Sequence, residues 1–382
     1  MNILITGGAG FIGSRLARRL AEDGSTVTVL DNLSPQIHGP EAVFPAVLQA
    51  GARCVQGDVC DGALVKDLLQ NQEVVVHLAA ETGTGQSMYA VERYGQVNMQ
   101  GTAVLLDRIV NDRPKALRKL VVASSRAVYG EGKYECATHG VVLPAARTSL
   151  HMAAGRFEPL CPICAEDVAP LATSEETPFS PSSFYGLTKQ VQEQMVLMFA
   201  AAMGLDGFAL RYQNVYGPGQ SLTNPYTGIL AIFSNLVRQG KPLNIFEDGR
   251  ESRDFVYIDD VIAATAACTA SDVHGVTALN VGSGVRTSVL DVAQEIARYF
   301  GAKVSINVTG DFRVGDIRHN YADIGRIGAL TSFSPKWQFK DGLHQFLSWA
   351  QGHDPSDSGF ERSLAELKER GLMQTGPARD QG

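Results

Sequence analysis

The sequence predicts an α/β protein with a doubly wound parallel sheet and a smaller, discontinuous C-terminal domain. Three observations support this prediction. Short β-branched runs alternate with helical patterns through the first half of the chain, a glycine-rich turn follows the first run, and two further apolar runs return later. Alternation of this kind is typical of βαβ units, which share one parallel sheet and bind ligands at the carboxyl ends of its strands.

Seven apolar runs are the expected strands of this sheet. Each run is short, and helical patterns follow most of them. The runs cover residues 2–6, 25–31, 52–59, 73–80, 119–125, 207–215 and 277–283, and the clearest helical patterns cover 11–23, 98–110, 190–202, 228–240, 257–270 and 288–301.

The order of these elements predicts how the chain divides into domains. We expect it to leave the sheet after about residue 210, to return near 256 and to leave again near 286. One domain would then contain residues 1–210 plus 256–286, and the other 211–255 plus 287–350. Residues 351–382 are expected to form a linker, a short helix at 363–371 and a frayed tail at 374–382.

Composition excludes several classes of partner. A chain of 382 residues with 45% hydrophobic residues can bury a large core, and its net charge of -7 without a basic cluster argues against nucleic acid or a polyanionic membrane surface. The first residues read as a strand, and we find no apolar stretch long enough to span a bilayer. We therefore expect a cytoplasmic protein, in which six cysteines would be free or metal-bound.

A dinucleotide site is predicted where the first strand meets the first helix. Gly7, Gly10 and Gly13 would permit the tight turn and a close approach of the backbone to a pyrophosphate at the helix N-terminus. Asp31 ends the second strand, where a carboxylate accepts hydrogen bonds from a ribose diol and repels a 2′-phosphate, so NAD is favoured over NADP. The alternative is a glycine turn with a capping aspartate. Asp58 is either an adenine-side contact or a turn residue.

Tyr185 and Lys189 form a second candidate group. At a spacing of four they would share one helix face. An ammonium near a phenol favours the phenolate and so lowers the pKa of the tyrosine, which makes it a usable general base. A chance pair is the alternative reading of these two residues alone.

Together the motifs resemble the extended short-chain dehydrogenase/reductases, and more narrowly their nucleotide-sugar epimerase/dehydratase branch. The matching segments are TGGAGFIG, Asp31, HLAA, NMQGT, SSRAVYG, YGLTK, RYQNVYGPGQ, RDFVYIDD and NVGSG, in order over about residues 1–350. The resemblance implies a Rossmann fold and a tightly bound NAD. Further cofactor residues that it implies are Phe11, Ile12, Asn32, Val59, Leu78, Ala79, Ala80 and Asn98. The alternative for Asn98 is a structural or water-binding role near the site.

The resemblance also implies roles for the reacting groups. Tyr185 would remove a sugar hydroxyl proton, Lys189 would bind the nicotinamide ribose, and Ser125, four residues before Tyr129, would hydrogen-bond the same hydroxyl. Dehydratases of this branch carry an acid pair directly after the catalytic Ser or Thr, because elimination needs a proton donor and a base. Here those positions hold Arg126 and Ala127, so epimerisation at C4 is favoured over dehydration or decarboxylation.

Substrate residues are predicted on the same basis. A diphosphate favours arginine, and Arg253 and Arg313 match the family's phosphate-binding positions, with Arg318 a third candidate or a solvated charge. Asn214 matches a position beside the diphosphate. In the loop 81–87, Thr82, Gln86 and Ser87 are candidates to contact the sugar, unless the loop has no ligand role.

Residues 131–175 form an insert with two short ligand spacings. Cys136-x2-His139 and Cys161-x2-Cys164 offer three thiols and an imidazole, the set used in closed tetrahedral zinc sites. Four unligated groups in a surface loop are the alternative. Cys54, Cys60 and Cys268 are expected to be small core residues.

The insert resembles that of a subset of bacterial nucleotide-sugar epimerases, which favours a dTDP-linked 6-deoxyhexose over the UDP-linked alternative. The family also implies a homodimer through the helices at 98–110 and 188–202, although their apolar stripes are compatible with ordinary core. Two other functions remain as alternatives: a non-catalytic NAD-binding regulator, and a redox sensor built on the cysteine pairs.

Overall fold

The computed structural model describes residues 1–382 except 40, 223, 225–227, 356–358 and 377–382. Its centre is a seven-stranded, fully parallel sheet in the order β13-β9-β5-β4-β1-β2-β3, so the predicted fold is confirmed. The strands are β1 (Asn2–Thr6), β2 (Thr26–Asp31), β3 (Ala52–Gln56), β4 (Val74–His77), β5 (Lys119–Ser125), β9 (Asp206–Tyr212) and β13 (Val276–Val281).

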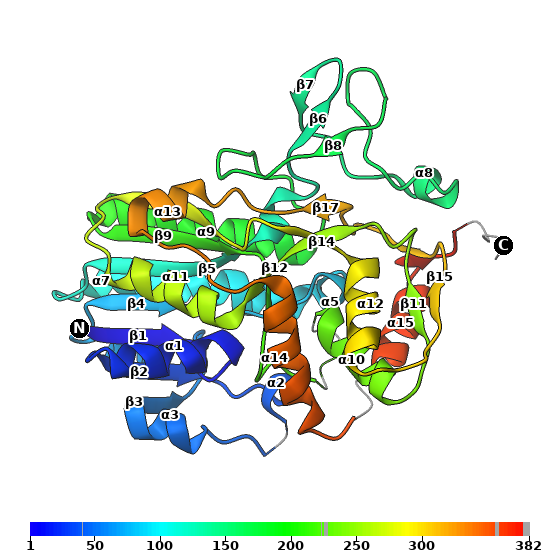
Figure 1. Ribbon diagram of the computed structural model, residues 1–382. Coiled ribbons are helices and arrows are strands. Elements are labelled where there is room, and N and C mark those ends of the chain that lie inside the picture. Colours follow the sequence, from blue (N-terminus) through cyan, green and yellow to red (C-terminus); the bar gives the residue numbers. More distant parts are fainter. Residues whose placement is uncertain (40, 223, 225–227, 356–358, 377–382) are drawn as a thin grey trace.

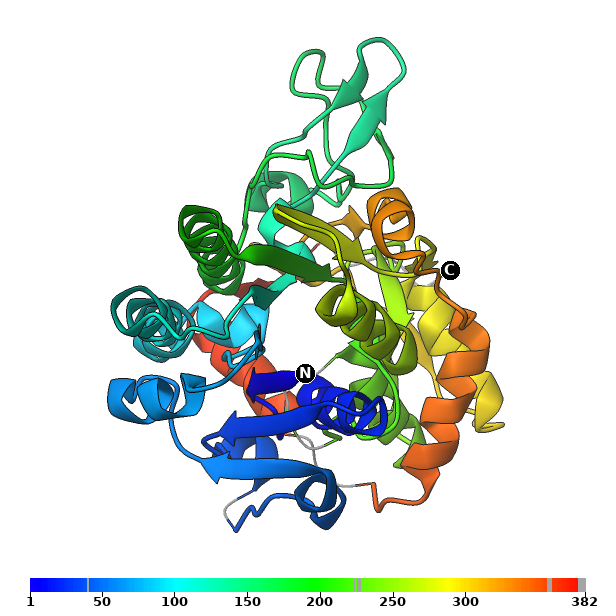
Figure 2. The ribbon, with the colours of Figure 1, turned by 90° about the vertical axis from the view of Figure 1, so that its left-hand side faces the viewer.

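Alternate residues of each strand pack against different helical layers. Ile3 and Ile5 of β1 join one apolar cluster, whereas Leu4 joins another on the opposite face. This follows from the period-two geometry of a strand and explains why the runs are apolar throughout. The first face is covered by α1 (Phe11–Glu22), α3 (Ala46–Gly51) and α11 (Ile258–Ala270), and the second by α4 (Gly62–Leu69), α7 (Gly101–Asp112) and α9 (Phe184–Met203) (Figure 2).

A smaller lobe covers the carboxyl ends of the strands (Figure 1). Its sheet contains β10 (Asn214–Tyr216), β12 (Ser252–Tyr257), β14 (Arg286–Ser288) and β17 (His319–Asn320), and its helices are α10 (Ile229–Arg238), α12 (Val289–Tyr299) and α14 (Phe339–Gln351). Strands β11 (Leu243–Ile245) and β15 (Ile306–Val308) pair beside it, and α13 (Gly325–Thr331) lies against β13. We keep the division into two domains at residues 210, 256 and 286 as a proposal.

The C-terminal segment departs from the expected frayed tail. The predicted short helix is α15 (Phe360–Glu369), and β18 (Met373–Gln374) pairs with β16 (Phe312–Arg313). The Tyr89 hydroxyl donates to Glu366 Oε2 (2.9 Å), which fixes α15 against the segment that follows β4. The expectation of a frayed tail is therefore wrong for Gln374, because its backbone joins a strand pair. The rest of the predicted tail after Gly376 lies outside the described residues.

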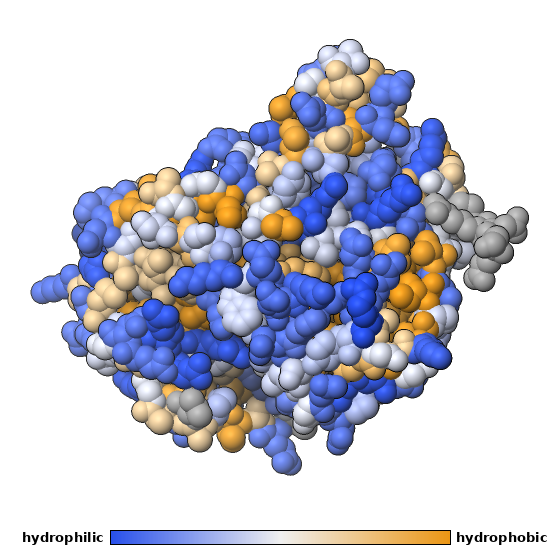
Figure 3. All heavy atoms as spheres, in the orientation of Figure 1, coloured by the Kyte–Doolittle hydropathy of each residue, from blue (hydrophilic) through white to orange (hydrophobic). Residues whose placement is uncertain are grey.

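The insert forms an arm that stands out from the body (Figures 1 and 3). It contains β6 (Tyr134–Cys136), β7 (Gly140–Val142) and β8 (Ala169–Pro170) in one antiparallel sheet, and α8 (Ser149–Ala153). The remaining short elements are α2 (Pro35–His38), α5 (Thr84–Ser87), α6 (Val91–Tyr94), a π-helix at Gly95–Gln100 and a 3-10 turn at Arg126–Tyr129. Within the described ranges, none of these helices is long and apolar enough to cross a membrane.

Candidate active site

The turn between β1 and α1 forms a cradle that only glycine allows. Gly7 has a φ of +70°, and a Cβ there would lie 2.6 Å from Ala79 N. A Cβ on Gly13 would lie 2.4 Å from the Gly7 carbonyl oxygen. Gly10 caps α1 without a side chain, so the first N–H groups of the helix remain available to an anion. The cradle fits the pyrophosphate of a dinucleotide.

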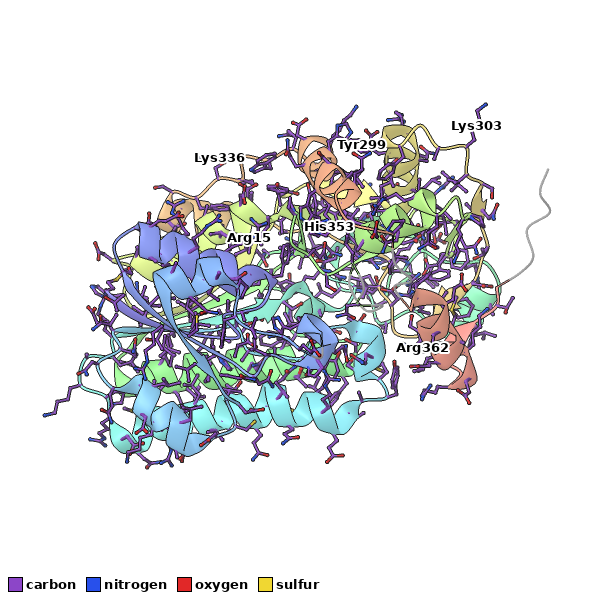
Figure 4. All side chains as sticks on the ribbon, turned by 90° about the horizontal axis from the view of Figure 1, so that it is seen from below. Arg15, Tyr299, Lys303, Lys336, His353 and Arg362 are labelled. Carbon is purple, nitrogen blue, oxygen red and sulfur yellow. The ribbon has the colours of Figure 1, made fainter. Side chains whose placement is uncertain are left out.

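A cavity of about 1320 Å³ opens from this turn along the carboxyl ends of the strands. Most of the predicted cofactor residues line it: Gly7, Gly10, Phe11, Ile12, Gly13, Asp31, Asn32, Asp58, Val59, Leu78, Ala79, Ala80, Tyr185 and Lys189. Arg15 and His353, which the sequence did not single out, line it as well (Figure 4).

Asp31 lies at the ribose end expected for NAD. Its carboxylate accepts hydrogen bonds from the N–H groups of Ala9 and Leu33, both at 2.9 Å. Each carboxylate oxygen keeps further acceptor capacity, which matches the two hydroxyls of a ribose. Asp58 Oδ2 accepts a hydrogen bond from the Asn32 amide (3.4 Å), and Asp58 Oδ1 accepts one from Cys60 N (2.8 Å). Asp58 therefore also acts as a turn residue, as the second reading of the sequence expected.

The predicted reacting groups meet at the inner end of the cavity. Ser125 ends β5, and both Tyr185 and Lys189 lie on α9, which begins at a Ser183 cap. The two adjacent serines have different surroundings. Both line the large cavity, but the Ser124 hydroxyl donates to Glu193 Oε2 (2.5 Å), whereas Ser125 also lines a smaller cavity beside Tyr185.

The electrostatics of this group differ in two respects from the expectation. Burial raises the pKa of Tyr185 above its usual value, and a hydrogen bond with Ser125 and the positive charge of Arg126 offset this only in part, so the net shift is opposite to the predicted lowering. Burial lowers the pKa of Lys189 to about 7, and its Nζ donates to the Ala123 carbonyl (2.9 Å). The cation that acts on Tyr185 in this structure is therefore Arg126, whereas the sequence assigned that effect to Lys189.

A second, smaller cavity of about 200 Å³ lies on the other side of Tyr185. Its lining includes Ser125, Arg126, Ala127, Gln213 and Asn214, and the described residues around it include neither aspartate nor glutamate. Gln213 lines both cavities, and neither atom of its buried amide has a hydrogen-bond partner among the described residues. Because buried polar groups normally have partners, Gln213 is suited to a ligand. No motif spacing identified it beforehand.

Positive charges gather beside this smaller cavity. Arg126 Nε donates to Asn214 Oδ1 (2.5 Å), and Arg253 pairs with Asp316 (2.9 Å). Burial raises the pKa of Asp316, but four arginines outweigh this effect and hold that pKa below its usual value. They are Arg253, Arg313, Arg147 and Arg126. Arg313 Nε is buried and has no hydrogen-bond partner in the part of the chain that the structure describes, which leaves a donor for an anionic ligand.

Arg318 was a candidate for the same role, and the structure instead places it in an ion-pair network. Its guanidinium is fully buried and pairs with four carboxylates. These are Glu158 (2.6 Å), Asp248 (2.7 Å), Glu247 (2.9 Å) and Glu251 (3.8 Å). Because these partners occupy its donors, Arg318 has none left for a diphosphate.

Three other predicted contacts have structural roles. Ser87 Oγ donates to the Thr84 carbonyl (2.7 Å) and accepts from Tyr185 N (2.9 Å), so it holds the start of α9. Gln86 exchanges hydrogen bonds with the Gln36 amide (3.0 and 3.2 Å). Asn98 is fully buried and forms hydrogen bonds with Glu81 and Thr188. These bonds match the structural role that was the alternative to cofactor binding. Thr82, in contrast, lines the larger cavity.

The four predicted metal ligands also come together. One ligand atom from each of Cys136, His139, Cys161 and Cys164 lies within 4.8 Å of the others, in the arm.

Comparison with known proteins identifies the family. Residues 3–149 and 163–282 match the NAD dependent epimerase/dehydratase family. The chain belongs to this family. It is 41% identical to the dTDP-L-rhamnose 4-epimerase of Burkholderia thailandensis over 349 residues, which cover 91% of this chain and 94% of the relative. The predicted NAD-dependent epimerase activity on a nucleotide-linked sugar is confirmed at the level of the family and its relatives.

Solved structures of epimerases share the fold. The UDP-glucose 4-epimerase of Thermotoga maritima with UDP-glucose has a TM-score of 0.74 at 28% identity, over 92% of this chain and 99% of that one. The UDP-glucuronic acid 4-epimerase of Bacillus cereus with UDP-glucuronic acid and NAD has a TM-score of 0.73 at 26% identity, with the same coverage. NAD is therefore the cofactor that the family and the cradle of this epimerase both indicate.

Proposed function

We propose that the enzyme inverts C4 of a dTDP-linked 6-deoxyhexose through a transient 4-keto sugar. The observation that carries this proposal is the position of Tyr185 and Ser125 between the large cavity and a small cavity whose described lining lacks an acid. The sugar in the small cavity would then present its C4 hydroxyl to Tyr185.

The proton steps follow from the side chains. Tyr185, as the phenolate, takes the proton of the C4 hydroxyl, and Ser125 holds that hydroxyl in line. When bound, NAD would supply the acceptor and the donor of the C4 hydride, and the glycine cradle, Asp31 and Lys189 would hold it. Tyr185 returns the proton to the C4 oxygen once the ketone is reduced on its opposite face, so the sum of the two halves changes only the configuration at C4.

Elimination of water needs an acid for the leaving hydroxyl and a base at the neighbouring carbon. Arg126 and Ala127 line the small cavity and stand where the family resemblance places such groups in dehydratases. Arg126 has no proton to give readily at neutral pH, because its pKa, lowered mainly by burial, is still about 10. Epimerisation is therefore the better supported reaction.

The proposed sugar also follows from the lining. Val215, Leu230 and Phe255 give the small cavity an apolar wall, which suits a 6-methyl group better than a hydroxymethyl or carboxylate group. Arg313 would hold the diphosphate in the role predicted for it, while Arg253 would add its charge and its Nε donor, because its terminal N–H groups already bond Asp316 and backbone carbonyls. The 41% identical relative is named for a dTDP-linked 6-deoxyhexose.

The test is to give the purified enzyme dTDP-L-rhamnose, UDP-glucose, UDP-N-acetylglucosamine and GDP-mannose in turn, and to analyse the products by chromatography and mass spectrometry. We expect a new peak of unchanged mass from dTDP-L-rhamnose. A product lighter by one water would instead identify a dehydratase. A new isomer from a UDP-sugar alone would keep the reaction and overturn the proposed substrate.

The homodimer and the cytoplasmic location stay predictions. Helices α7 and α9 lie side by side, and Met99, Ala103, Val191 and Met195 line an apolar groove between them. This arrangement is compatible with the expected pairing of two copies through these helices.

A further inference from the structure

The arm formed by the insert has little core of its own. Five buried residues form its apolar cluster: Tyr134, Cys136, Val142, Cys161 and Val168. Two of these five are cysteines. An apolar cluster of this size does not by itself fix a segment as long as residues 131–175, and small folds of this kind depend on a cross-link or a metal.

The geometry of the four ligand atoms matches a metal site. Cys136 Sγ lies 3.5 Å from His139 Nδ1 and 3.7 Å from Cys164 Sγ, and Cys161 Sγ lies 3.6 Å from His139 Nδ1. A tetrahedral zinc ion with bonds of about 2.3 Å to sulfur and about 2.0 Å to nitrogen places its ligand atoms roughly 3.4–3.8 Å apart. These three separations fall in that interval and all six lie within 4.8 Å, so a zinc ion fits between the four atoms after a small inward adjustment of the ligands.

Backbone turns set these ligands in two pairs. Cys136 and His139 flank the turn between β6 and β7, where Cys136 is opposite Gly140. Cys161 and Cys164 lie in a second turn, closed by a bridge between Leu160 and Asp167 and by the Cys161 N–H bond to Glu166 O (2.8 Å). Two turns from distant parts of the insert therefore present their ligands to one point.

We propose that Cys136, His139, Cys161 and Cys164 bind one structural zinc ion. The three cysteines and the histidine supply four ligands, which fill a tetrahedral site and leave no position for substrate or water. A disulfide does not account for the cluster, because the cysteines are free and the 3.7 Å separation of Cys136 and Cys164 is far from the roughly 2.0 Å of a sulfur–sulfur bond.

The structure indicates what the zinc ion holds in place. Between the two turns the chain carries Arg147 and Glu158, which form ion pairs with the C-terminal lobe. Arg147 bonds Glu247 (2.8 Å) and the Asp316 carbonyl (3.0 Å), and Glu158 bonds Arg318 (2.6 Å). The metal would close the loop that contains both residues and so keep the arm seated on that lobe.

Metal content of the full chain, purified under reducing conditions without chelator, tests the proposal. We expect about one zinc per chain in the wild type and in the Cys54→Ser control, and less than about a tenth of that in Cys161→Ser. His139→Cys should keep the metal, because a set of four cysteine thiolates also binds zinc, whereas His139→Ala should lose most of it. Wild-type protein that lacks zinc and does not take it up after reduction and addition of zinc chloride would overturn the proposal.

Cobalt replacement and proteolysis provide readouts that do not depend on activity. The Co²⁺-loaded protein should show the strong absorption of tetrahedral thiolate coordination, and Cys161→Ser should lose it. Chelation under reducing conditions should accelerate cleavage between residues 137 and 168 while NAD binding is retained. Octahedral Co²⁺ spectra, or cleavage of the arm at the same rate with and without metal, would contradict a closed structural site. None of these results depends on the sugar that the enzyme uses.

Discussion

Arg126 and Asn214 join the two halves of the small cavity. The guanidinium Nε donates to the Asn214 side-chain oxygen at 2.5 Å, and the same positive charge lowers the pKa of Tyr185. Arg126 follows β5 directly, and Asn214 begins β10, so a contact across the cavity links the proposed base to the strand beside the substrate. One residue is therefore positioned to affect both chemistry and binding.

Arg126→Met should move the activity of the enzyme to higher pH. Without the positive charge the pKa of Tyr185 rises further, so the phenolate forms only at higher pH and the alkaline rise of kcat should shift upward. Arg126→Lys retains the charge and is the control. Identical pH profiles for all three proteins would contradict an electrostatic effect on Tyr185.

Tyr185→Phe removes the proposed base without a change of shape. We expect kcat to fall by about 10³-fold or more, because no other described group lining the small cavity replaces it. Thermal unfolding and NAD content should match the wild type, which separates loss of chemistry from loss of fold. Unchanged turnover would exclude Tyr185 as the base.

Gly13→Ala should impair the cofactor cradle. A Cβ at Gly13 meets the Gly7 carbonyl oxygen at 2.4 Å, so either the turn or α1 has to move, and overpacking of this kind costs about 1–3 kcal/mol. Gly62→Ala is the matched control, because a Cβ there meets its nearest neighbour at an ordinary 3.6 Å. Bound NAD, released by heat and quantified by chromatography, should fall in the first variant only.

Lys189→Met should separate stability from catalysis. Burial lowers the pKa of Lys189 to about 7, whereas the unfolded chain keeps its ammonium up to about 10.5. The unfolded state binds the extra proton between these values, so the stability of the cofactor-free protein decreases as pH falls from 10 to 7. In the variant this slope should flatten, and kcat should fall by about 10²-fold or more. Urea unfolding at pH 7 and pH 9 measures the slope, and equal slopes in both proteins would contradict this prediction.

Glu158→Gln tests the ion pairs that seat the arm. Burial raises the pKa of Glu158, but hydrogen bonds from His319 and Arg318 prevail and lower that pKa to about 2. Its stabilising effect is thus fully present above about pH 4.5 and disappears as pH falls toward 2. The variant should be less stable at pH 7, and the difference should shrink below pH 4. Glu135→Gln, on the exposed side of β6, should follow the wild type throughout.

The parts of the site that the sequence predicted share one physical origin. Parallel strands end at one edge of a sheet, so the residues that follow them meet regardless of their separation in the chain. This rule brings together the glycine turn, Asp31 and Ser125, and the helical spacing of four adds Lys189 to Tyr185.

The contacts that the sequence did not predict have an equally specific cause. An arginine near a phosphate and an arginine in an ion pair look alike in a sequence, and what decides between them for Arg318 is carboxylates located 67 to 160 residues away. Ser87 and Gln86 lie in the expected loop, but their partners, the start of α9 and Gln36, were not foreseeable from a local pattern. Gln213 lies inside the segment RYQNVYGPGQ, but the sequence did not single it out, since its importance lies in an amide left unpaired between two cavities among the described residues.

The pairing of β16 with β18 bears on how the enzyme is made by the ribosome. Domains generally fold in the order of synthesis, N-terminal part first. The glycine turn, Asp31, Ser125, Tyr185 and Lys189 all emerge before β9 is complete, whereas the strand that carries Arg313 waits for Met373 and Gln374 near the very end of translation. Of the proposed diphosphate residues, Arg313 is therefore the last whose strand finds its partner, and a message truncated before Met373 would leave β16 unpaired.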